Sequence, residues 1–221
     1  MSLIFNNIDK MSFDDLGEES EFIPLMTSED EEALEKENLP EVLPILPLTN
    51  TVLFPGVVIP INAGRDKSIK LINDANKSNK LIGVVAQKDI KIENPSIENI
   101  FNIGTVAKIL RVLKMPDGNT TVIIQGKKRF KIKSVVKTDP YIQATINSIT
   151  DKNQKKSNSK FTATIDAIKD IALKIIKENP NIPSEASFAI KNIHSSAFLI
   201  NFVCSNMNIT VKNKQELLSS L

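Results

Sequence analysis

The sequence has 221 residues, of which 41% are apolar and 24% charged, and its net charge at pH 7 is +2. This length suffices for one large domain or two small ones, and the composition is that of a globular protein. No window reaches the roughly 18 apolar residues of a membrane-spanning helix, and the acidic N-terminus is unlike a basic targeting signal, so we expect a cytoplasmic protein without membrane contact. A single cysteine, Cys204, and a single histidine, His194, exclude an internal disulfide and a Cys/His zinc site.

Acidic residues are concentrated near the N-terminus. Through Glu41 the chain has 13 acidic residues and two lysines, a net charge of −11, whereas the remainder carries 26 basic and 13 acidic residues, a net charge of +13. Residues 1–40 have too few apolar side chains to offset the entropy lost on ordering, which predicts a disordered acidic tail. The alternative hypothesis is that this tail lies on the basic domain as an electrostatic mask. Its anchors would be apolar residues of the tail: Phe22, Ile23, Leu25 and Met26.

Regular patterns begin at residue 42. Residues 42–48 form an apolar run with two prolines, which predicts an edge or bulged strand because proline lacks the N–H of a ladder. Residues 57–61 predict a second strand, and residues 65–79 predict a short amphipathic helix, since apolar residues recur there at helical spacing. Residues 80–87 predict a third, buried strand in which Gly83 marks a bend or a close backbone approach.

Residues 104–148 predict successive antiparallel strands. The segment 115–118, MPDG, suits a type I turn and predicts a hairpin between residues 105–114 and 120–125. After Gly126, alternating apolar and basic residues predict a further strand with Phe130 and Ile132 on one face. Residues 141–149 supply another strand. Short strands at this spacing, with one small helix, predict a closed or nearly closed β-barrel over residues 41–150.

Polar residues 151–159 predict a linker, and helical patterns follow it. A long helix is indicated by one apolar stripe: Phe161, Ile165, Ile168, Ala172 and Ile175. Two shorter helices are predicted after Pro183 and after His194, and the last residues resemble the start of another. The predicted class is therefore α+β, an antiparallel β-barrel followed by a small all-helical subdomain over residues 151–221 that is truncated at its C-terminal end.

Motifs for catalysis or nucleotide binding are missing from the sequence. In a phosphate-binding GxxxxGK[ST] loop ending at Gly126, Thr121 would replace the first glycine and Lys128 the Ser or Thr. No GxSxG motif is present for a serine nucleophile. We therefore predict no catalytic residue, cofactor or metal site in this chain, and we expect Cys204 to be a buried small hydrophobe and His194 a capping or surface residue.

Basic residues cluster in one strand region, and the cluster has two interpretations. It suits contact with a nucleic-acid backbone, or equally a solvated strand face, and Phe130 is the only aromatic residue available there to stack on a base. Its members are Lys127, Lys128, Arg129, Lys131, Lys133 and Lys137.

Several ordered motifs between residues 42 and 150 resemble the N-terminal substrate-recognition domain of ATP-dependent Lon proteases. Residues 46–69, LPLTNTVLFPGVVIPINAGRDKSI, resemble the family's first strand, its FPG step and its glycine–arginine pair before a serine-bearing helix. The similarity continues through residues 87–89, Pro95, residues 100–107, the hairpin at 115–118 and the G-x-x-R turn at 126–129. Phe101 stands where the family usually has tyrosine, and Asn50 where it usually has arginine or lysine. Residues 151–221 agree only in being helical.

This resemblance implies a PUA-like β-barrel that captures unfolded or damaged polypeptides and helps to assemble a hexameric protease. It further implies that the ATPase, with its ATP and Mg²⁺, and a serine–lysine protease dyad lie downstream of this chain. Because a turn exposes its side chains and exposed apolar patches mark interaction sites, we predict a substrate-binding surface at the FPG step. Its residues would be Phe54, Pro55, Val57 and Met115.

Three functions remain open from the sequence. The first is the substrate-recognition and assembly part of an ATP-dependent protease. The second is a stand-alone adaptor or regulator of the same domain family. The third is a nucleic-acid-binding module with weak contact through the basic strand.

Overall fold

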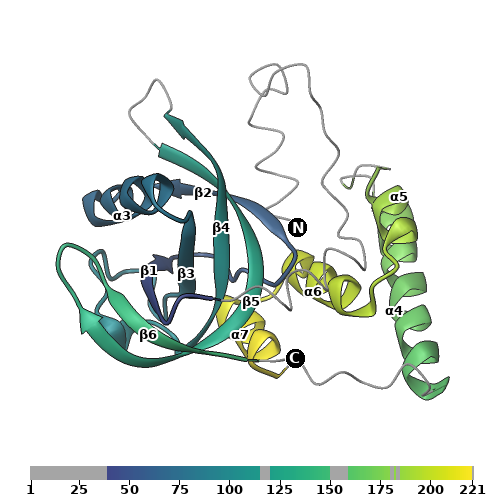
Figure 1. The fold of residues 1–221 in the computed structure, drawn as a ribbon. Helices are drawn as coiled ribbons and strands as arrows, with labels where there is room; N and C mark the ends of the chain where they lie inside the picture. The colour runs from purple at the N-terminus through teal and green to yellow at the C-terminus, as the bar shows by residue number, and fades with distance from the viewer. Residues whose placement is uncertain (1–38, 115–119, 150–158, 180–181, 183–184, 221) are drawn as a thin grey trace.

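The computed structural model describes residues 39–114, 120–149, 159–179, 182 and 185–220 (Figure 1). The described part contains a six-stranded sheet, a short helix α3 and a group of four further helices. The strands are β1 (Val42–Leu48), β2 (Val58–Ala63), β3 (Leu81–Ala86), β4 (Ile103–Lys114), β5 (Thr120–Lys137) and β6 (Gln143–Ser148). The helices are α3 (Asp66–Lys77), α4 (Ser159–Glu178), α5 (Glu185–Asn192), α6 (Ser196–Asn206) and α7 (Val211–Ser220), with a 3₁₀ turn at Ile97–Asn99. The predicted α+β class is confirmed.

The sheet closes through its longest strand. Its order is β2-β5-β4-β3-β1-β6, and β6 also pairs with β5, so five strands form a closed ring of pairings and β2 is attached outside it. β1 and β3 are parallel, and the other pairs are antiparallel. The prediction of a wholly antiparallel arrangement is therefore wrong, because α3 returns the chain to the end of the sheet where β1 began and β3 then runs beside β1 in the same direction (Figure 1).

The prolines of β1 are accommodated by a change of partner. The first half of the strand, through Pro44, pairs with β6, and the second half, from Ile45, pairs with β3. Ile45 lies at the crossover, since it pairs with Gly83 of β3 and its N–H donates to the carbonyl of Ile142 at 2.8 Å. Each half is an edge on one side, so the missing N–H of a proline interrupts a ladder on one side only.

Core packing explains Gly83. A Cβ built on Gly83 would lie 2.6 Å from Ile45 Cδ1 and 2.9 Å from Phe130 Cζ, so this glycine leaves room for two core side chains and not for the close backbone approach that was predicted. Phe130 is buried and Ile132 half-buried, while Lys131 and Lys133 are exposed, so the predicted alternation is confirmed over these four residues. The strand itself is longer than predicted, because residues 120–137 run as one strand through Gly126. The predicted turn at 115–118 lies outside the described residues.

The helices form a series that leads back to the sheet. α4 contacts α5 and α6, α6 contacts α7, and α7 contacts β4 (Figure 1). Gln215 of α7 donates from Nε2 to the carbonyl of Ile103 at 2.9 Å. Buried residues of α5, α6 and α7 belong to the same apolar cluster as those of the strands. The predicted domain boundaries at 40/41 and 150/151 stay predictions, and the acidic tail through residue 38 lies outside the described residues.

The apolar stripe of α4 is rotated relative to the prediction. Ile165 and Ala172 pack against the core cluster as expected, and Leu173 and Ile176 join them. Ile175 does not, since 52% of its surface is exposed. The prediction for Ile175 is wrong because α4 has apolar residues on two faces, and spacing alone does not say which face is covered.

Candidate functional site

The FPG step lies between β1 and β2 and is packed onto β5. Gly56, whose φ of 78° suits glycine, donates its N–H to the carbonyl of Gly126 at 2.9 Å, and the N–H of Gly126 donates to the carbonyl of Val57 at 2.9 Å. The hydroxyl of Thr105 donates to the carbonyl of Leu53 at 2.6 Å. These bonds hold the turn against the sheet.

This packing removes the exposure on which the predicted substrate surface depended. Phe54 is 0% exposed, and Pro55 and Val57 are also buried. Met115 lies outside the described residues. The expectation that a phenylalanine in this turn faces solvent is therefore wrong, because the turn folds onto a strand 70 residues further along the chain.

The surroundings of Gly126 do not fit a phosphate-binding loop. It lies within β5, its N–H is used by Val57, and a Cβ built on it would lie 2.3 Å from the carbonyl oxygen of Phe54. A phosphate-binding loop needs backbone N–H groups that point freely at the phosphate oxygens. ATP does not fit these residues.

Helix α7 packs over one basic residue of β5, whereas other basic residues of this strand are exposed. Arg129 is buried and donates from Nη1 to the carbonyl of Leu218 in α7 at 2.9 Å. The prediction that Arg129 belongs to an exposed basic surface is wrong, because α7 packs over its position. Lys131, Lys133 and Lys137 are exposed. Contact of this strand with nucleic acid stays a prediction.

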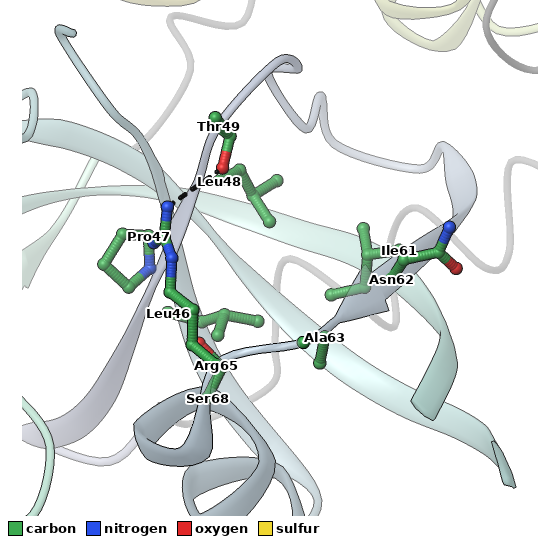
Figure 2. Close-up of a pocket in the computed structure, with 10 residues that line it drawn as sticks. Leu46, Pro47, Leu48, Thr49, Ile61, Asn62, Ala63, Arg65 and Ser68 are labelled. Atoms are coloured by element: carbon green, nitrogen blue, oxygen red, sulfur yellow. Dashed lines mark hydrogen bonds between the residues drawn. The ribbon is translucent and has the colours of Figure 1, made fainter. Parts of the chain in front are cut away.

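A pocket lies between β1, β2 and the start of α3 (Figure 2). We call it the Arg65 pocket; its volume is about 230 Å³, and its lining residues are Leu46, Pro47, Leu48, Thr49, Ile61, Asn62, Ala63, Gly64, Arg65 and Ser68. Figure 2 shows Arg65 extending from the start of α3 along β1 to Thr49, with Ile61 and Ala63 on the opposite wall. The lining therefore combines the Arg65 guanidinium with polar side chains, Thr49, Asn62 and Ser68, and with apolar side chains, most of which are buried.

The guanidinium of Arg65 is held by two neutral acceptors. Its Nη2 donates to Thr49 Oγ1 at 3.2 Å and to Gln87 Oε1 at 3.1 Å. Gln87 is buried, and its Nε2 donates to the carbonyls of Asp89 and Ile92. The amide of Gln87 is thereby fixed with its oxygen toward Arg65.

Sequence reasoning did not identify this pair as a site. The only signals were a glycine–arginine step after the second strand and a glutamine at the end of the third. Arg65 and Gln87 are 22 residues apart in the sequence, and the fold brings their side chains together beside β1.

A second concave surface lies between two helices. The groove between α4 and α5, which we call the α4–α5 groove, has a volume of about 420 Å³ and is lined by Leu173, Ile176, Lys177, Asn179, Ile182, Ser187 and Lys191. The same helices expose large apolar side chains, with Ile171 60% and Phe188 59% exposed. Exposed apolar groups gathered on neighbouring elements are typical of interaction surfaces.

The remaining chemically reactive side chains have structural surroundings. Cys204 is buried, as predicted, and burial raises the pKa of its thiol. Burial lowers the pKa of Lys214, whose Nζ donates to the carbonyl of Ser205 at 2.6 Å. His194 is exposed, as expected, and the cap of α6 is the neighbouring Ser195, whose Oγ accepts from the N–H of Phe198 at 3.0 Å.

The described residues offer neither a metal-binding cluster nor a membrane-spanning helix. No group of three or more His, Cys, Asp or Glu side chains there is arranged to hold a metal ion. None of the described helices combines the length and the apolar character needed to cross a membrane.

The family is shown by comparison with known proteins. Residues 42–221 match the family model described as the ATP-dependent protease La (LON) substrate-binding domain. Since this match covers most of the chain, the chain belongs to that family. The resemblance seen in residues 42–150 is confirmed and extends through the helices.

Individual relatives give the same result. The chain is 62% identical over 212 residues to a Lon protease of Flavobacterium johnsoniae, covering 96% of this chain and 26% of the relative. It is 50% identical over 198 residues to a Lon protease of Cytophaga hutchinsonii, covering 90% of this chain and 24% of the relative. The chain thus spans about a quarter of the length of these relatives.

Two solved structures share the fold. The N-terminal domain of a Mycobacterium avium complex Lon protease superposes with a TM-score of 0.64 at 19% identity, covering 80% of this chain and 89% of that chain. A Lon N-terminal domain protein of Xanthomonas campestris superposes with a TM-score of 0.57 at 15% identity, with the same coverage.

Proposed function

We propose that this chain is the non-catalytic N-terminal part of a Lon-type ATP-dependent protease, that it binds unfolded or damaged polypeptides, and that it supports assembly of a hexamer in the cytoplasm. The family's description as a substrate-binding domain and the short span relative to the curated relatives support this proposal. ATP, Mg²⁺ and the serine–lysine dyad would belong to the rest of the protein. The closed ring of strand pairings supports a PUA-like barrel.

The observation that carries the proposal is the apolar surface of α4 and α5. No residue of the 20-residue helix α4 is buried, although much of the helix is apolar. Unfolded polypeptides differ from folded ones in exposing apolar segments, so the exposed apolar side chains of these helices, Ile171 on α4 and Phe188 on α5, would bind them by hydrophobic contact irrespective of sequence.

The FPG residues are not accessible to a substrate in this structure. Phe54, Pro55 and Val57 are buried, so contact with a substrate would require the turn to leave β5. Substrate contact by these residues and by Met115 stays a prediction.

The test compares exposed apolar residues on α4 and α5 with an equally exposed isoleucine elsewhere in the chain. Ile171 on α4 is 60% exposed, and Ile90, in the segment between β3 and β4, is 59% exposed. Binding of a reduced, carboxymethylated protein that stays unfolded is measured by fluorescence anisotropy with the full chain. We expect the double variant Ile171→Ser, Phe188→Ser to bind about tenfold more weakly, a change of about 1.4 kcal/mol, and Ile90→Ser to bind as the wild type does.

Either of two results would overturn the proposal. The first is that the wild-type chain does not bind the unfolded protein. The second is that the α4–α5 double variant and Ile90→Ser weaken binding equally. Circular dichroism of each variant establishes that the fold is retained.

If the chain is instead a stand-alone adaptor or regulator, it should bind the same polypeptides. The two functions are distinguished by the reading frame of the gene. The frame either continues beyond Leu221 into an ATPase or stops. The nucleic-acid alternative predicts binding of RNA or DNA that falls steeply with salt and is lost when Lys131, Lys133 and Lys137 are replaced.

A further inference from the structure

We propose that the Arg65 pocket binds a phosphate group, either inorganic phosphate or the phosphate of a modified residue in a polypeptide. Three features of the pocket support this inference: the guanidinium of Arg65, the hydroxyl of Ser68 and the N-terminus of α3 (Figure 2). The pocket shares no residue with the α4–α5 groove, so the inference goes beyond the proposed function and does not depend on it.

Arg65 gives the pocket a positive charge. It is the only charged residue among those that line the pocket, and among the described residues no carboxylate lies within ion-pair distance of it. Its bonds to Thr49 and Gln87 both start from Nη2, which leaves the N–H donors of Nη1 and Nε for a ligand. Gln87 is buried and its amide is fixed by two backbone carbonyls, so the guanidinium is positioned before a ligand arrives.

Ser68 brings an unpartnered hydroxyl to the same pocket. It is the third residue of α3, it lines the pocket, and only 9% of its surface is exposed. Figure 2 shows its side chain at the start of α3, below that of Arg65 in this view. A buried hydroxyl ordinarily has a hydrogen-bond partner, yet the described residues supply none to Ser68. A ligand in the pocket would supply the missing partner.

The first turn of α3 adds backbone donors. No side chain caps this helix, and its first bond runs from the N–H of Ile69 to the carbonyl of Arg65 at 2.9 Å. The N–H groups of residues 66–68 thus have no acceptor in the described part of the chain. Asp66 lies in this turn, but its side chain is exposed and does not line the pocket. Free N–H groups at the positive end of a helix dipole favour an anion.

The donors and the size of the pocket favour phosphate over other anions. A carboxylate has about four acceptor positions on two oxygens, and the guanidinium, the hydroxyl and the helix N-terminus together supply more donors than that. A phosphate group carries a charge of about −1.5 to −2 at pH 7 and at least three strong acceptor oxygens. The volume of about 230 Å³ lies below the roughly 300–1,000 Å³ of cofactor sites, which favours a single phosphate group over a nucleotide.

The experiment measures binding of inorganic phosphate to the full chain by phosphorus NMR titration. Ionic strength is held constant, because salt screens the attraction between exposed charges. We expect saturable binding that an equal concentration of acetate does not displace. Arg65→Gln should weaken binding about tenfold or more, because hydrogen bonds between two charged groups are the strongest ones.

A second variant keeps the proposal testable if Arg65→Gln does not fold. The hydroxyl of Ser68 has no partner among the described residues and alanine is a better helix former, so Ser68→Ala should be as stable as the wild type. We expect it to weaken phosphate binding about three- to tenfold. Ser78→Ala, at the exposed C-terminal end of the same helix, is the matched control and should bind phosphate as the wild type does.

Peptides distinguish the two sources of the phosphate group. Binding of a fluorescent peptide with one phosphoserine, and of the same peptide unmodified, is measured by fluorescence anisotropy. A phosphopeptide that binds more tightly than inorganic phosphate and than its unmodified form would identify a modified polypeptide as the ligand. A phosphopeptide that binds no more tightly than inorganic phosphate would identify free phosphate.

The outcomes separate this site from the proposed function. The site would be overturned if the wild type bound no phosphate, if acetate displaced phosphate at equal concentration, or if Arg65→Gln or Ser68→Ala, once folded, bound phosphate as tightly as the wild type. The Ile171→Ser, Phe188→Ser double variant should bind phosphate normally. Loss of unfolded-protein binding in that variant, together with absence of phosphate binding in the wild type, would leave the proposed function standing and refute the Arg65 site alone.

Discussion

Replacing Gly126 with alanine should release the FPG turn from β5. The new Cβ would lie 2.3 Å from the carbonyl oxygen of Phe54 and 3.1 Å from its carbon. Non-bonded carbon atoms normally rest roughly 3.5–4.0 Å apart, so the turn must move by about an ångström. That movement strains or breaks the two hydrogen bonds that Gly126 exchanges with Gly56 and Val57, both of 2.9 Å.

The magnitude follows from these contacts. Straining or breaking two backbone hydrogen bonds costs about 0.5–1 kcal/mol each, and overpacking costs about 1–3 kcal/mol, so we expect Gly126→Ala to lower the free energy of unfolding by about 2–5 kcal/mol. For a chain of this size that is a decrease in Tm of roughly 4–20 °C. The measurement is urea-induced unfolding followed by far-UV circular dichroism, since the chain has no tryptophan.

Gly64→Ala is the matched control. No atom lies within 4 Å of the Cβ that it introduces, so we expect it to be neutral or to stabilise the fold by up to about 1 kcal/mol through the unfolded state. A loss of less than about 1 kcal/mol in Gly126→Ala would refute the conclusion that the turn is held tightly against β5.

Three further predictions concern buried or capping groups. Phe54→Ser should lower the free energy of unfolding by about 3–5 kcal/mol, because Phe54 is fully buried; a stability like that of the wild type would mean that the turn is open in solution. Ser195→Ala should cost about 0.5–2 kcal/mol by removing the N-cap of α6, while His194→Ala, one residue earlier and exposed, should cost almost nothing; equal losses would contradict the cap. Burial lowers the pKa of Lys214 below its ordinary 10.5, so between the lowered pKa and 10.5 the unfolded chain holds a proton that the folded chain has released, and stability rises with pH. As the pH is raised toward 10.5, the unfolding free energy of the wild type should therefore rise relative to that of Lys214→Met, and a flat or falling difference would contradict the assignment.

The hydrophobic pattern of the sequence predicted the structure correctly for elements that bury one face and expose the other. The amphipathic segment at residues 65–79 forms α3, and the alternation around Phe130 places that ring inside. These elements are predictable because their periodicity reports directly on burial. The same reasoning marked Gly83 as a crowded position, although core side chains approach it and not the backbone that was predicted.

Contacts between distant segments were not predictable from local pattern. Arg129 alternates with inward-facing residues as a surface residue would, yet the carbonyl of Leu218, 89 residues later, lies over it. Phe54 lies in a turn, where exposure is the usual outcome, yet Gly126 draws the turn onto the sheet. Arg65 meets partners 16 and 22 residues away, Thr49 and Gln87. The Arg65 pocket therefore becomes visible only in three dimensions.

The attachment of α7 to the sheet affects the order in which the chain can mature during synthesis. Gln215 bonds to the carbonyl of Ile103 across 112 residues, and Arg129 bonds to that of Leu218 across 89. Closing such long loops is entropically costly and slows folding. While a ribosome is still making the helices, Ile103 and Arg129 in the strands lack their hydrogen-bond partners Gln215 and Leu218. A nascent chain halted before residue 215 should therefore remain more sensitive to protease than the finished chain.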